Sequence, residues 1–147
     1  MRVMLDTNIL VSAFVFRSKK IYAAIDYIVT NHELVLPSYV VEELRGVVDR
    51  KFPRMASELD VFLTTLSFTL TYTPNKVPTG LFEIRDVPDA PILYTAIIEG
   101  IDVLVTGDKD FDDVDIEMPE IMTIAMFEKK YLLTHTNQKN PLMGCLE

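Results

Sequence analysis

Acidic side chains recur at positions where a parallel α/β fold can gather them. Asp6 and Asp108 each lie just past the end of a short apolar run, while Glu43 lies beside the apolar stripe of an expected helix and Asp89 opens another. Carboxylates repel one another, so a cluster of them is stable only with positive charge between them. The expected occupant is a divalent metal such as Mg²⁺, which prefers carboxylate oxygens and water as ligands.

Composition indicates one globular domain. The chain has 147 residues, of which 49% are hydrophobic and 24% charged, and we predict a domain over 1–133 with a flexible tail over 134–147.

Apolar runs fall far short of the roughly 20 residues of a membrane span, and the N-terminus lacks the apolar stretch of a signal peptide. The lone Cys145 excludes an internal disulfide and a cysteine-based metal site. We therefore expect a cytoplasmic protein.

The net charge of −8 argues against a simple basic nucleic-acid binder. Clustered carboxylates account for about half of this excess, and a bound metal offsets them locally, so a nuclease is not excluded. Contacts to phosphate are expected from cations near the acidic positions, namely Arg17, Lys19, Lys20, Arg45, Arg85 and Lys109.

Short apolar runs alternate with segments of helical periodicity. The runs predict strands at 2–5, 34–36, 68–72, 101–105 and 121–124, and the segments between them predict helices. This alternation favours a three-layer α/β/α fold with a central, mainly parallel sheet of four to five strands. In such sheets the ligand crevice lies beyond the carboxyl ends of the strands, where Asp6 and Asp108 stand.

Two local patterns give more detailed expectations. Ser38 is a plausible N-cap for the helix that follows the second strand. In the third strand, Phe68, Leu70 and Tyr72 alternate with threonines, which is the period of a half-exposed strand.

The acidic positions differ in how well an ordinary structural role explains them. Asp6 is also a plausible turn or N-cap residue, with Thr7 and Asn8 able to cap a helix or to orient a metal-bound water. At about 100° per residue, Glu42 lies nearly opposite the apolar stripe of its helix, whereas Glu43 lies at the edge of the stripe. We therefore choose Glu43 as the candidate ligand.

The later acidic positions leave alternatives open. Asp89 is a plausible N-cap as well as a ligand, and Asp86, three residues earlier, can take its place. Asp108 follows Gly107 in an acidic turn, where Asp110 continues the charge. Thr106 is small enough to hydrogen-bond a carboxylate or a water. His32 and His135 lie outside every motif.

Taken together, these motifs resemble the PIN-domain family, close to the toxin components of toxin–antitoxin systems. The resemblance runs from Met1 to about Tyr131, and its motifs are Asp6-Thr7-Asn8, Glu43-Leu44, Arg85 to Leu93, and Thr106 to Phe111. No single motif is specific, but the set is.

The resemblance implies a PIN-like fold and a metal-dependent endoribonuclease that hydrolyses RNA with Mg²⁺ or Mn²⁺. It further implies a small antitoxin protein as partner, and a homodimer. Carried onto this sequence, the catalytic and metal-binding acids are Asp6, Glu43, Asp89 and Asp108. The supporting positions are Asn8, Thr106, Asp110 and Asp86. Apolar side chains such as Phe14, Phe16, Ile21 and Tyr22 are candidates for a partner interface.

Other readings of the acidic pattern remain. A phosphatase of the haloacid dehalogenase type needs a second Asp two residues after the first, where this chain has Asn8. A receiver-like signalling module needs an acidic pair after the first strand, which is not evident. The alternative we keep is a Mg²⁺-binding signalling or protein-interaction module without nuclease activity.

Overall fold

A five-stranded sheet forms the centre of the molecule. The computed structural model describes residues 1–73, 90–107, 111 and 114–132. Within them the strand order is β3-β2-β1-β4-β5, and every neighbouring pair is parallel. The strands are β1 (Arg2–Leu5), β2 (Glu33–Pro37), β3 (Thr69–Thr71), β4 (Val103–Val105) and β5 (Glu120–Met122). The predicted tail, 134–147, lies outside the described residues.

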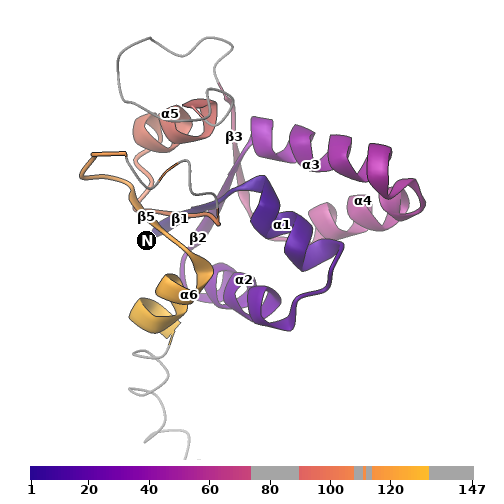
Figure 1. The fold of residues 1–147 in the computed structure, drawn as a ribbon, viewed down its shortest axis with the longest axis horizontal. Helices are drawn as coiled ribbons and strands as arrows, with labels where there is room; N and C mark the ends of the chain where they lie inside the picture. Colours follow the sequence, from indigo (N-terminus) through magenta and orange to yellow (C-terminus); the bar gives the residue numbers. More distant parts are fainter. Residues whose placement is uncertain (74–89, 108–110, 112–113, 133–147) are drawn as a thin grey trace, which may run out of the picture.

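Helices cover both faces of this sheet. Figure 1 shows α5 on one side of the sheet and α2 with α6 on the other, so the predicted three-layer α/β/α arrangement is confirmed. The helices are α1 (Thr7–Phe14), α2 (Lys19–Asn31), α3 (Ser38–Lys51), α4 (Ala56–Thr65), α5 (Ala90–Ile98) and α6 (Ile124–Phe127). A 3₁₀ turn, η1 (Pro53–Met55), precedes α4, and a π-helical turn, η4 (Glu128–Leu132), follows α6.

The central strands are buried because they carry apolar side chains on both faces. Val3, Met4 and Leu5 of β1 are fully buried, as are Leu104 and Val105 of β4. Continuous apolar runs of this kind are typical of parallel strands covered by helices on both sides. Within the described ranges, no helix combines the length and the apolar character needed to span a bilayer.

The start of α3 departs from the expected cap. Pro37 is the N-cap residue and makes no side-chain cap bond, whereas Ser38 is the first residue of the helix. The Ser38 hydroxyl instead accepts a hydrogen bond from the Thr73 backbone N–H at 2.9 Å, and the Thr73 hydroxyl accepts one from the Tyr39 N–H at 3.1 Å. These two bonds tie α3 to the chain that leaves β3, a long-range contact that outweighs the local cap preference.

The third strand also differs in its orientation. Leu70 and Tyr72 are 44% and 77% exposed, whereas Thr71 is 7% exposed. Thr69 is also exposed, so the expected alternation of exposure is not seen and Thr71 is the buried residue of this strand. Among the described strands, β3 lies at the edge of the sheet and pairs with β2, so its apolar residues need not face a helix.

The strand order creates one place where a ligand crevice is expected. β2 and then β3 lie on one side of β1, and β4 and then β5 lie on its other side. The connections therefore reverse between β1 and β4, and open α/β sheets bind ligands beyond the carboxyl ends of the strands at such a switch point. Leu5 is in register with Val105, so Asp6 and Thr106 leave the sheet side by side at this point.

Candidate functional site

Asp6 is held at the junction of β1 and α1. It is the N-cap of α1, and its Oδ1 accepts a hydrogen bond from the Ile9 backbone N–H at 3.1 Å. Its own N–H donates to the Val105 carbonyl at 3.2 Å, which extends the pairing of β1 with β4 by one residue. The side chain is only 4% exposed. The capping role and a ligand role are therefore compatible, because the cap fixes the direction of the carboxylate.

Thr106 contacts the same carboxylate from the neighbouring strand. Its hydroxyl donates a hydrogen bond to Asp6 Oδ2, and its N–H donates to the Met122 carbonyl at 2.9 Å. The side chain is 3% exposed, so this bond is shielded from water. The prediction that Thr106 hydrogen-bonds a carboxylate fits this contact.

Protein donors orient both oxygens of the Asp6 carboxylate. Its Oδ1 accepts from the Ile9 N–H and its Oδ2 from the Thr106 hydroxyl. Outer hydrogen bonds of this kind commonly orient metal-binding carboxylates. The hydroxyl of the next residue, Thr7, is buried and has no hydrogen-bond partner among the described residues. An oriented carboxylate supplies the kind of oxygen ligand that a hard cation prefers.

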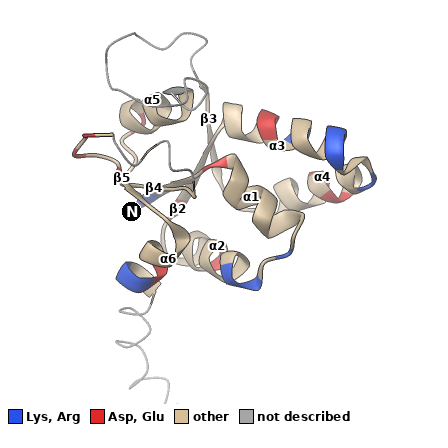
Figure 2. Cartoon of the chain, viewed as in Figure 1, with Lys and Arg blue, Asp and Glu red and all other residues tan. Residues whose placement is uncertain are grey.

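Glu43 lies on α3, which begins where β2 ends. Its turn therefore stands at the same end of the sheet as Asp6, and Figure 2 shows acidic ribbon both at the start of α1 and in the first half of α3. Glu42 and Glu43 are both exposed. Val40, Leu44 and Val48 form the buried side of α3, which leaves Glu43 on its flank and Glu42 nearly opposite. No contact joins Glu43 to Asp6 among the described residues.

Four predicted positions lie outside the described residues: Asp86, Asp89, Asp108 and Asp110. Their nearest described neighbours are Ala90, the first residue of α5, and Gly107, which follows Thr106 after the end of β4. Within the described ranges, no group of three or more metal-capable side chains comes together. The four-carboxylate set therefore stays a prediction, of which Asp6 and Glu43 are the described members.

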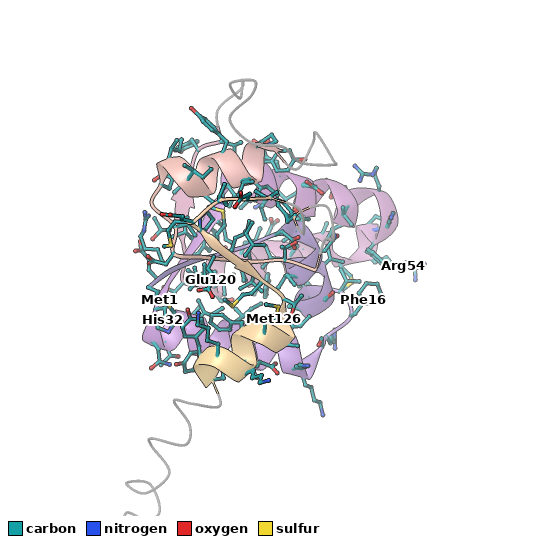
Figure 3. All side chains as sticks on the ribbon, turned by 60° about the vertical axis from the view of Figure 1, so that its left-hand side comes forward. Met1, Phe16, His32, Arg54, Glu120 and Met126 are labelled. Carbon is teal, nitrogen blue, oxygen red and sulfur yellow. The ribbon has the colours of Figure 1, made fainter. Side chains whose placement is uncertain are left out.

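The remaining predicted polar residues are placed as follows. Asn8 is exposed in the first turn of α1. His32 precedes β2 at the opposite, amino end of the sheet, where its Nδ1 lies 3.2 Å from the amino group of Met1 (Figure 3). This position agrees with the prediction that His32 is outside the site, while His135 lies outside the described residues.

Several predicted phosphate-binding cations are engaged by carboxylates. Arg45 pairs with Asp60 on α4 at 2.6 Å. Lys20 lies 3.7 Å from Glu128, and Arg17 lies 4.0 Å from Glu58. Arg85 and Lys109 lie outside the described residues. Arg17, Lys20 and Arg45 therefore form local pairs at the surface, which are individually weak. No ion pair joins Lys19 to another described residue.

Sequence reasoning missed a pocket that opens beside Thr106. It has a volume of about 480 Å³ and lies along β5, with Gly107, Glu117, Ile121 and Met126 among its lining residues. Thr106 and the residues of β5 are far apart in the sequence, and the pairing of β4 with β5 brings them together.

Comparison with known proteins agrees with this architecture. The family described as "PIN domain" matches residues 2–110. Among solved structures, VapBC2 from Rickettsia felis, bound to a DNA fragment from its promoter, matches with a TM-score of 0.62 and 22% identity over 83% of this chain and 97% of that chain. VapC20 from Mycobacterium tuberculosis, a toxin that cleaves the sarcin–ricin loop, matches with a TM-score of 0.54 and 12% identity over 75% and 92%. No curated protein sequence matches the chain.

Proposed function

Because the chain belongs to the PIN-domain family, we propose that it is a metal-dependent endoribonuclease, the toxin of a type II toxin–antitoxin pair. The observation that carries the proposal is the Asp6 carboxylate at the β1–β4 switch point, fixed by Ile9 and Thr106. A buried and oriented carboxylate at this place in the fold is suited to binding a cation that contacts a phosphodiester.

In this proposal Asp6, Glu43, Asp89 and Asp108 are the catalytic and metal-binding acids. Thr106 positions Asp6, Asn8 and Asp110 support the site, and Asp86 is the alternative to Asp89. Bound Mg²⁺ or Mn²⁺ would supply an activated water and charge stabilisation on the phosphate. The work of Thr106 and of the α1 N-terminus is to hold the Asp6 carboxylate in one orientation, so that little reorganisation is needed when substrate binds.

A protein partner has a suitable surface away from this site. A groove of about 340 Å³ runs between α2 and α4 and is lined mainly by apolar side chains, including Tyr22, Val29, Phe62 and Leu66. Tyr22 is 46% exposed and contacts Phe62 edge-on, with ring centroids 6.2 Å apart. An apolar groove between two helices suits an amphipathic segment of a second protein. We assign this groove to the antitoxin. We also propose that the chain forms a homodimer.

Cleavage of RNA tests the proposed activity. The protein is incubated with single-stranded RNA and Mg²⁺ or Mn²⁺, with and without EDTA, beside Asp6→Asn and the surface control Glu42→Gln. The proposal expects metal-dependent cleavage that Asp6→Asn lowers at least about 100-fold and Glu42→Gln leaves unchanged. Metal binding without cleavage of any RNA in a broad panel would instead favour a Mg²⁺-binding signalling or protein-interaction module.

A further inference from the structure

The pocket along β5, here called the β5 pocket, shares a wall with the candidate catalytic site. Thr106 lines the pocket and also donates its hydroxyl hydrogen bond to Asp6. Its volume of about 480 Å³ is in the range of small-ligand sites. A group bound in the pocket can therefore contact Thr106, the residue that orients the Asp6 carboxylate.

The walls of the β5 pocket suit a flat apolar group. Phe111, Ile116, Met122 and Met126 contribute apolar surface, and Met126 is 54% exposed in α6. Methionine sulfur makes favourable contacts with aromatic rings, and its flexible side chain adapts to their shape. Figure 3 labels Glu120, at the start of β5, and Met126, which both line the pocket.

The described lining of the pocket is acidic and offers phosphate no cation. Neither Lys nor Arg appears among its described lining residues, whereas Glu117 and Glu120 both do. Glu120 is engaged by Lys130 at 2.5 Å and by the Tyr131 hydroxyl at 3.3 Å. Glu117 is exposed and makes no hydrogen bond or ion pair with another described residue, so its carboxylate is the available acceptor.

The open edge of β5 adds backbone hydrogen-bonding groups. Glu120 donates to the Asp102 carbonyl and Met122 accepts from the Thr106 N–H, so these two residues face β4. In a parallel pair the intervening residue faces the other way, which turns the Ile121 N–H and carbonyl toward the unpaired edge. Ile121 also lines the pocket, so an amide donor, an amide acceptor and a carboxylate are available to one ligand.

We propose that the β5 pocket binds a nucleobase of the RNA beside the cleaved phosphodiester, and that Glu117 favours bases with an exocyclic amino group over uracil. This inference rests on the proposed nuclease function. A carboxylate accepts hydrogen bonds from amino groups such as cytosine N4, and uracil offers a carbonyl at the corresponding position. A peptide strand added to the β5 edge is the competing occupant, but the nearness of Thr106 and Asp6 favours the substrate.

Two measurements test the proposal independently of each other. In the first, a randomised RNA pool is cleaved by the wild type, by Glu117→Gln and by the control Glu58→Gln on α4, and the new ends are sequenced. We expect a preference of about tenfold for amino-bearing bases over uracil at one position flanking the cut. Glu117→Gln should reduce this preference at least about threefold, and Glu58→Gln should retain it.

In the second measurement, the methyl resonance of Met126 is followed by NMR as cytidine or uridine is added, with Met126→Leu to assign the signal. Cytidine should shift the resonance at lower concentration than uridine, and Glu117→Gln should remove the difference. Absence of RNA cleavage with this shift retained would overturn the nuclease function but not the pocket. Base preference untouched by Glu117→Gln, no shift with either nucleoside, or a shift only with a protein partner would each overturn the pocket assignment.

Discussion

At the scale of single residues, Thr106 and Asp6 depend on each other. The Thr106 hydroxyl donates to one Asp6 oxygen while the Ile9 N–H donates to the other, and both side chains are almost fully buried. The carboxylate therefore has one orientation. Thr106 is a positioning residue in this account, and its effect on the reaction passes through Asp6.

Replacing Thr106 by Val tests this role. The side chains have nearly the same shape, so the fold should be retained while the bond to Asp6 is lost. Loss of an outer hydrogen bond to a metal-binding residue commonly lowers metal affinity or activity by about 10–100-fold. We expect a fall of that size in kcat/KM and in Mn²⁺ affinity, with recovery in Thr106→Ser.

Thr71→Val is the matched control for Thr106→Val. Thr71 is a buried strand threonine whose hydroxyl has no hydrogen-bond partner in the described part of the chain. The control should leave kcat/KM unchanged. Equal losses in the two variants would show that Thr106 acts only through packing.

At the scale of elements, Asp6 is also the N-cap of helix α1. Substitutions at Asp6 can therefore separate a loss of stability from a loss of activity. Asparagine can accept the same hydrogen bond from Ile9, and the Thr106 hydroxyl can rotate to suit the amide. Asp6→Asn should therefore unfold in urea at nearly the wild-type midpoint. Asp6→Ala should lose about 0.5–2 kcal/mol of unfolding free energy, as is typical for removal of a cap. A large destabilisation in Asp6→Asn would contradict the assignment of its activity loss to chemistry.

The elements also show where sequence reasoning succeeded. The apolar runs predicted β1 and β4 because central parallel strands are buried on both faces, and the position of Asp6 at a strand end followed directly. The cap at Ser38 and the orientation of β3 could not be predicted, because Ser38 bonds to Thr73 and the covered side of β3 depends on distant neighbours. Whether Glu43, Asp89 and Asp108 meet at Asp6 likewise depends on tertiary placement, and that stays a prediction.

At the scale of the whole molecule, the two proposed interfaces are separate. The described lining of the α2–α4 groove that we assign to the antitoxin includes neither Asp6 nor Thr106, so an antitoxin bound there needs a second segment to reach the site. Tyr22→Lys should weaken copurification with the proposed antitoxin and leave RNA cleavage intact.

Ile98→Lys is the control for the groove. Ile98 is 51% exposed on α5, across the sheet from α2. Ile98→Lys therefore also places a lysine at an exposed apolar position, but on the other face of the molecule. Copurification lost equally in both variants, or in neither, would contradict the assignment of the groove to the partner.

We propose that the carboxylates at the β1–β4 switch point hold a divalent metal, and diffraction from Mn²⁺-soaked crystals at the manganese absorption edge would locate such an ion. We expect an anomalous peak about 2.0–2.6 Å from an Asp6 carboxylate oxygen, with Glu43, Asp89 and Asp108 as ligands directly or through water. The peak should be absent in Asp6→Ala crystals. A manganese ion bound elsewhere, or four carboxylates more than about 10 Å apart with no ion between them, would contradict the claim, because metal–oxygen bonds cannot span that distance.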